Sequence, residues 1–158
     1  MAYHFRLEAL LRVRRRLKEA AEAELARATG VLKEARDKEE MLAGQLREAK
    51  QDLSGRITEG MVAKEYQWRQ EQVSALEERF EKAFQARVAA EQEVEQLRAR
   101  LAQRHRDVEL IEKFRERDYQ EYLREIMRQE QIEADDMASI RFVMNRVEKE
   151  AINEKQHS

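Results

Sequence analysis

Apolar residues recur at alternating steps of three and four through the first third of the chain. Thirteen positions from Leu11 to Leu53 fall on this spacing, and ten of them are apolar. Such a period is typical of a helix that packs along one narrow stripe. We therefore predict a helix over about residues 4–53. Its packing stripe, the first seam, comprises Leu11, Arg14, Lys18, Ala21, Leu25, Ala28, Leu32, Ala35, Glu39, Leu42, Leu46, Ala49 and Leu53.

The pattern breaks over residues 54–61, where Gly55 and Gly60 stand close to Ser54 and Thr58. Glycine, serine and threonine so close together indicate a turn, so we predict a hinge at 54–61.

A second seam follows the hinge and keeps the same spacing. No Gly or Pro occurs after Gly60, so a single helix is expected over about 62–148, followed by a frayed tail at 149–158. The second seam comprises Val62, Tyr66, Arg69, Val73, Leu76, Phe80, Ala83, Arg87, Ala90, Val94, Leu97, Leu101, Arg104, Val108 and Ile111.

Two seams joined by a short hinge predict an all-α protein, a long antiparallel two-helix coiled coil that forms one domain. If opposing residue numbers sum to 115, Ala35 faces Phe80 and Leu32 faces Ala83, so that small side chains meet large ones. In this register, cysteines at Leu32 and Ala83 would crosslink within one molecule.

The second helix is predicted to extend beyond the first. In the predicted register the first helix ends opposite about residue 110, which leaves about 45 residues without an intramolecular partner. Two interpretations remain open: the overhang is a fraying tail, or it enters a cavity or ring of another protein.

Composition supports a helical rod and excludes strand-rich folds. The 158 residues include no Pro, no Cys and 4 Gly, and Ala, Glu, Lys, Leu and Arg make up 93 of them. The absence of cysteine excludes disulfides and thiolate metal sites and fits a reducing cytoplasm. Because no segment approaches 18 uncharged residues, we expect a cytoplasmic protein that does not insert into a membrane.

Catalytic motifs are not apparent. His4, His105 and His157 are isolated in sequence, and the Gly55-x-x-x-x-Gly60 spacing is followed by Met61 instead of the lysine of a phosphate-binding loop. We expect no enzyme activity, no cofactor and no metal.

Local charge is more informative than the net charge of -2. Two runs rich in arginine contain no acid, and the predicted register places them side by side. We call this set the basic collar: Arg12, Arg14, Arg15, Arg16, Lys18, Arg98, Arg100, Arg104 and Arg106. It is either a pair of solvated helix faces or a docking site for an acidic protein surface. Nucleic acid is not expected, because no aromatic residues are interleaved for stacking.

Two aromatic residues, Trp68 and Phe84, lie off the second seam shortly after the hinge. Exposed aromatic side chains often contact partners, so we assign both to a second candidate docking face.

Several motifs together resemble the FliJ family. The chain opens with Phe5-x-Leu7-x-x-Leu10-Leu11-x-x-Arg14 and has a glycine hinge after about fifty residues. The late run contains Glu112-Lys113, Tyr119, Tyr122, Glu130-Gln131-Ile132, Asp135-Asp136 and Ala138, with Ile132 and Asp136 where the family usually has Lys and Glu.

The resemblance implies a cytoplasmic, stalk-like component of the flagellar type III export apparatus. FliJ-like proteins are thought to sit in the ring of the export ATPase, to contact the cytoplasmic region of the export gate at the inner membrane, and to deal with export chaperones. On this basis the candidate ATPase contacts are the basic collar together with Tyr119, Tyr122, Glu130, Gln131 and Asp135. The candidate gate contacts are Trp68 and Phe84.

Two alternatives stay open at this point. One is the equivalent stalk of a virulence injectisome, with the same fold and other partners. The other is a self-associating coiled-coil scaffold without an ATPase partner.

Overall fold

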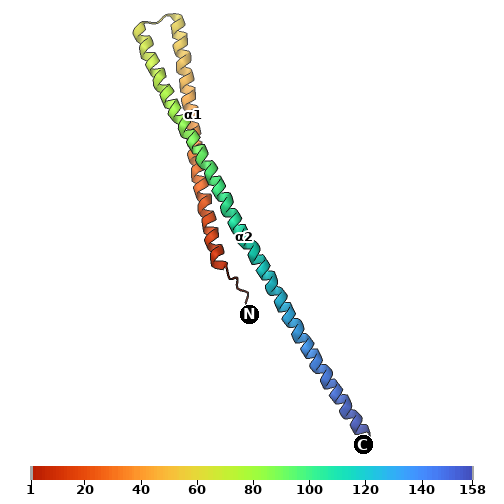
Figure 1. The fold of residues 1–158 in the computed structure, drawn as a ribbon. Coiled ribbons are helices and arrows are strands. Elements are labelled where there is room, and N and C mark those ends of the chain that lie inside the picture. Colours follow the sequence, from red (N-terminus) through yellow and green to blue (C-terminus); the bar gives the residue numbers. More distant parts are fainter. Residues whose placement is uncertain (1, 158) are drawn as a thin grey trace. The chain divides into compact units, whose positions relative to one another are not determined.

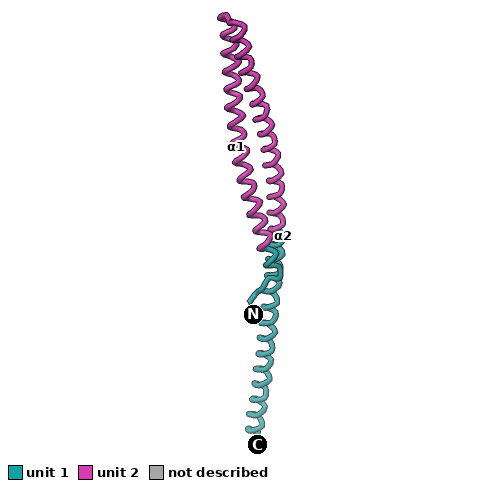
Figure 2. Tube along the Cα trace, turned by 90° about the vertical axis from the view of Figure 1, so that its left-hand side faces the viewer, with its two compact units in different colours: residues 1–11, 109–158 teal, residues 12–108 magenta. Residues whose placement is uncertain are grey.

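The computed structural model describes residues 2–157 and contains two helices, α1 (Glu8–Glu59) and α2 (Ala63–His157) (Figure 1). No strand occurs among these residues, as predicted for an all-α protein. The chain divides into two compact units (Figure 2). One comprises residues 12–108, and the other comprises the described residues of 1–11 together with those of 109–158.

The larger unit is an antiparallel hairpin of α1 and α2 that packs along the two predicted seams. Every position of the first seam is buried or half-buried, and so is every position of the second seam from Arg69 onward. Leu32, Leu42, Val73 and Val94 are among the buried core residues. The spacing of apolar residues thus identified the packing face of both helices.

The predicted hinge at 54–61 is wrong over most of its length, because α1 continues to Glu59 and only residues 60–62 are non-helical. The hydroxyl of Thr58 donates to the Ser54 carbonyl at 3.0 Å and Arg56 pairs with Asp52, so this last turn retains local partners. Among the described residues, only Gly60 has a positive φ, 96°. Glycine adopts this left-handed conformation without a steric penalty, and it ends the helix there.

Because the turn is shorter than predicted, the first residues after it do not pack in the seam. Val62 and Tyr66, predicted as seam residues, are 70% and 44% exposed. Next to the turn the helices are held instead by ion pairs, Arg56 with Glu65 at 3.5 Å and Arg69 with Asp52 at 2.7 Å.

Ion pairs across the hairpin establish a register that differs from the predicted one. Arg69 pairs with Asp52 near the turn, and Arg14 pairs with Asp107 at 3.5 Å near the other end. The residue numbers in these two pairs sum to 121, and those in the other ion pairs across the hairpin sum to between 121 and 127, whereas the predicted register sums to 115. The predicted pairing of Leu32 with Ala83 is therefore wrong.

The physical reason is the position of the turn. Residues that face each other in a hairpin are equally far from its centre, and this centre lies at residue 61 instead of between 57 and 58. The shift corresponds to about one heptad, so the same seam positions remain inside but meet different partners.

In the smaller unit, residues 2–7 precede α1 as a non-helical strap that lies along α2. The prediction of helix from residue 4 is wrong here. Phe5 is buried, and its carbonyl accepts a hydrogen bond from the amide of Glu8 at 3.2 Å as the helix begins. Glu8 pairs with Arg115 at 3.6 Å, and the Tyr3 hydroxyl donates to Asp118 at 2.9 Å. The strap thus covers a part of α2 that was expected to be bare.

Beyond this contact, α2 continues as an exposed helix. Leu123 and Ile126 are half-buried, and every described residue from Met127 to His157 is exposed. The bare segment therefore starts about 17 residues later than the predicted position of 110. Residues 149–157, predicted to fray, are helical, and residue 158 lies outside the described range. None of the helices among the described residues is long and apolar enough to span a membrane.

Candidate partner-binding surfaces

The basic collar carries less uncompensated positive charge than its sequence indicates, because acids outside the two arginine-rich runs form ion pairs with some of its members. Arg14 pairs with Asp107, Arg98 with Glu95 at 3.7 Å, and Arg100 with Glu24 at 3.2 Å. The guanidinium of Arg106 donates to Gln103 Oε1 at 3.0 Å. Because the register is shifted, Arg100 lies beside Glu24 instead of beside the run at 12–18.

Three members of the collar occupy seam positions: Arg14, which pairs with Asp107, and two others. Lys18 and Arg104 are both seam positions and both half-buried. The neighbouring pairs, Arg14 with Asp107 and Glu24 with Arg100, place Lys18 and Arg104 at the same level of the hairpin. Like charges at one level of a seam repel, so we expect this layer to cost free energy.

The other members of the run on α1 lie outside the seam. Arg12 and Arg16 are exposed, and Arg15 is half-buried. A step of four residues puts Arg12 and Arg16 on one side of α1, away from the seam positions Leu11, Arg14 and Lys18. The collar therefore consists of a seam layer and a separate outward face.

Tyr119 and Tyr122 form an aromatic cluster with Tyr3 of the strap. The ring of Tyr3 lies 5.1 Å from each of the other two rings, which are 6.3 Å apart. Burial raises the pKa of Tyr3 to about 12, and its hydrogen bond to Asp118 adds to the effect. The strap was not predicted from the sequence, although Phe5 in the opening motif lies off the heptad spacing of the first seam.

Glu130, Gln131 and Asp135 lie on the exposed part of α2. The side-chain amide of Gln131 donates to Asp135 Oδ1 at 3.1 Å, one helical turn away. Glu125, shortly before them, pairs with Arg128 at 2.7 Å, and hydrogen bonds from Arg128 lower the pKa of Glu125. All these contacts lie within one helix, so the segment remains accessible to a partner.

Trp68 and Phe84 are 57% and 39% exposed, and each has an arginine against its ring. The guanidinium of Arg69 lies 5.9 Å from the Trp68 ring, and that of Arg87 lies 5.0 Å from the Phe84 ring. Sixteen residues of helix separate the two aromatics by about 24 Å and by about 160° of rotation. They are therefore two separate exposed sites instead of one continuous face.

A polar network in the middle of the hairpin was not anticipated. Arg87 pairs with Glu39 across the seam and with Glu91 at 3.0 Å, and Arg36 reaches Glu91 at 3.2 Å. Hydrogen bonds from Arg36 and then Arg87 lower the pKa of Glu91, and the carboxylates raise the pKa of Arg87. The sequence did contain a signal for this network, since Glu39 and Arg87, one acid and one base, occupy seam positions of opposite helices.

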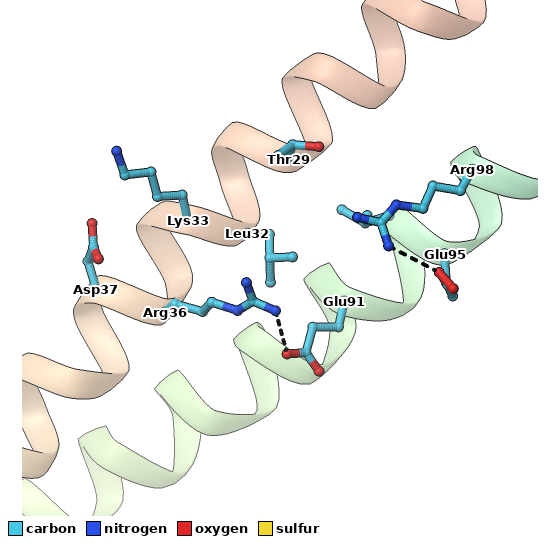
Figure 3. Close-up of a pocket in the computed structure, with 9 residues that line it drawn as sticks. Thr29, Leu32, Lys33, Arg36, Asp37, Glu91, Glu95 and Arg98 are labelled. Atoms are coloured by element: carbon cyan, nitrogen blue, oxygen red, sulfur yellow. Dashed lines mark hydrogen bonds and ion pairs between the residues drawn. The ribbon is translucent and has the colours of Figure 1, made fainter. Parts of the chain in front are cut away.

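Figure 3 shows the groove beside this network, which has a volume of about 450 Å³. Leu32 and Val94 line it together with polar side chains. The ion pair of Arg36 with Glu91 bridges the two helices, and that of Arg98 with Glu95 lies on α2. A second groove of about 520 Å³ is lined by Leu42 and Ala83. No group of three or more metal-ligating side chains occurs within residues 2–157.

Comparison with known proteins identifies the family. The family described as Flagellar FliJ protein matches residues 3–146, which is most of the chain. The chain belongs to the FliJ family. It is therefore a component of the flagellar type III export machinery, and the family is a non-catalytic part of that machinery. A search of curated protein sequences finds no match to this FliJ-family chain.

A solved structure shares the fold of this FliJ-family chain. It is described as a putative YscO homolog, CT670, from Chlamydia trachomatis. It is 19% identical, with a TM-score of 0.61, and the match covers 92% of this chain and 98% of CT670. At this level of identity the comparison supports the helical hairpin fold and is silent on partners.

Proposed function

We propose that the chain is a stalk-like adaptor that links the export ATPase ring to the cytoplasmic region of the export gate. In this role it assists delivery of chaperone-bound substrates at the flagellar base and catalyses no reaction of its own. Membership of the FliJ family supports the setting, and the hairpin with its exposed α2 segment supports the mode of contact.

The observation that carries the proposal is the layer of Lys18 and Arg104. Natural seams usually hold apolar or oppositely charged residues, because a like-charge layer destabilises the hairpin. Retaining two half-buried cations at this level is best accounted for by an acidic partner surface that compensates them. We assign this surface to the ATPase ring.

The remaining candidate residues fit the same scheme. Tyr119, Tyr122, Glu130, Gln131 and Asp135 lie on α2 beyond the hairpin unit, and we assign them to ATPase contacts as well. Trp68 and Phe84 lie toward the turn, and we assign them to the export gate as two separate contacts.

ATP hydrolysis by the cognate export ATPase, measured with and without the chain, tests the proposal. We expect the wild-type chain to promote ring assembly and to raise hydrolysis. Lys18→Glu should reduce the stimulation several-fold, because it removes the positive layer. Lys33→Glu makes the same charge change at an exposed position of α1 outside the collar and serves as the matched control.

Two results would contradict the proposal. The first is hydrolysis that stays unchanged when wild-type chain is added. The second is a dimer in sedimentation that leaves the ATPase unbound, since this behaviour belongs to a self-associating scaffold.

A further inference from the structure

The outward face of α1 near the start of the hairpin combines exposed cations with exposed aliphatic side chains. Arg12 and Arg16 are exposed, and the neighbouring Val13 and Leu17 are 51% and 36% exposed. Each pair is separated by four residues, so the two cations and the two aliphatics form adjacent stripes on one side of the helix. We call this set of four residues the outward basic face.

The cations of this face are not used by the fold. Neither Arg12 nor Arg16 has an ion pair or a side-chain hydrogen bond with any described residue, whereas Arg14 on the seam side is paired with Asp107. No acid occurs from residue 12 to residue 18. The face therefore presents two guanidinium groups that make no ion pair with the described residues.

We propose that the outward basic face docks on the surface of a bilayer that contains anionic phospholipids. A helix lies flat on such a surface when its apolar stripe reaches the acyl boundary and flanking cations meet the headgroup phosphates. Guanidinium groups suit this role because they form bidentate hydrogen bonds to phosphate.

The size of the face favours lipid over a protein partner. Two aliphatic side chains form a much smaller apolar centre than a stable protein interface requires. Weak, reversible attachment to a charged membrane needs only a few cations and a shallow apolar contact. The helix lies on the surface in this arrangement, since α1 has no stretch capable of spanning a bilayer.

The proposal goes beyond the adaptor function and is separable from it. Contact with the ATPase is assigned to the seam layer and tested by Lys18→Glu. Contact with lipid is assigned to Arg12 and Arg16, on another side of α1. A chain that stimulates the ATPase without binding vesicles, or binds vesicles without stimulating the ATPase, would therefore contradict one proposal and leave the other standing.

Co-sedimentation of the full chain with lipid vesicles tests the inference. We expect binding to vesicles of phosphatidylglycerol and phosphatidylcholine, little binding to pure phosphatidylcholine, and loss of binding as salt is raised. Arg12→Glu combined with Arg16→Glu should weaken binding at least about tenfold. Arg27→Glu combined with Arg47→Glu changes the net charge equally at exposed positions of α1 outside the face and should retain binding.

A fluorescent reporter separates docking of this face from general attraction. The chain has one tryptophan, so Leu17→Trp in a Trp68→Phe background places the only indole on the outward basic face. Its emission should shift to shorter wavelength with anionic vesicles, while the indole of wild-type Trp68 should not respond. Three results would each overturn the proposal: absent wild-type binding, equal binding by the Arg12 and Arg16 double variant, or unshifted emission from the bound Leu17→Trp reporter.

Discussion

Arg87 of α2 pairs with Glu39 of α1 across the seam of the hairpin, at positions where a coiled coil ordinarily holds apolar side chains. Both side chains are largely shielded from solvent, with 22% and 18% of their surface exposed. A polar pair in a seam is satisfied in one register only, whereas apolar layers are satisfied whenever the helices slide by a whole heptad. The pair therefore selects the register in which the hairpin folds.

A charge swap tests this role. Arg87→Glu and Glu39→Arg should each lower Tm, because each single variant places two like charges together in the seam. The double variant should recover part of the loss, since the pair between positions 39 and 87 is restored with its polarity reversed while the pair with Glu91 is lost. Thermal unfolding followed by circular dichroism measures the coupling. Additive losses in the double variant would show that the pair does not select the register.

Engineered cysteines test the register directly. Leu42 and Ala83 are buried and line the same groove, so cysteines at these two positions should form a disulfide within one molecule. Cysteines at Leu32 and Ala83 should not, because Leu32 lies in the other groove with Val94. Oxidation followed by gel electrophoresis under non-reducing conditions distinguishes the two. Efficient closure of the Leu32 and Ala83 pair would reinstate the register that sums to 115.

The acid sensitivity of the hairpin should depend on Glu91. Its pKa is lowered below the ordinary 4.5 by Arg36 and Arg87, so its ionised form is favoured in the folded state. This contribution to stability is fully present above the ordinary value and is lost as the pH falls through the lower folded value. Glu91→Gln should thus lower Tm at neutral pH and have little effect in strong acid. A difference in Tm that grows toward low pH would contradict the assignment.

Lys18→Glu should make the hairpin more stable. The substitution replaces a like-charge layer with an ion pair to Arg104, at a level where both side chains are half-buried. We expect a higher Tm together with weaker stimulation of the ATPase, the usual sign that a functional site is maintained at a cost in stability. Lys33→Glu should leave Tm nearly unchanged. A fall in Tm for Lys18→Glu would show that the two cations do not face each other.

The strap should be visible in an alkaline titration. The pKa of Tyr3 is about 12 because the neutral phenol is partly buried and donates to Asp118. The neutral form is favoured in the fold, so the associated stability is present below a pH of about 10 and is lost as the pH rises through 12. Absorbance of tyrosinate should show one component that ionises late, and Tyr3→Phe should remove it. An unchanged late component would assign it to another tyrosine.

Individual residues show how far the sequence could be interpreted. Leu11, Leu32 and Val94 were placed in the seams by spacing alone, and all are buried. The extent of the turn was not predictable in the same way, because Gly55 and Gly60 look alike in sequence and only Gly60 takes a positive φ. The strap was missed because Tyr3 acts through contacts with α2 that lie more than a hundred residues away.

Two helices, their packing faces and the membership of the FliJ family were determined by the sequence, because heptad spacing is a local property that a chain carries wherever it folds. The register was decided only by the tertiary structure. Apolar layers recur every seven residues and tolerate several alignments, but the predicted one places Arg14 opposite Leu101 and Glu24 opposite Glu91, a pair of like charges. In the alignment observed, Arg14 meets Asp107 and Glu24 meets Arg100. The apolar pattern allows several alignments. One of them is selected because oppositely charged side chains pair across the hairpin and because the turn lies at Gly60.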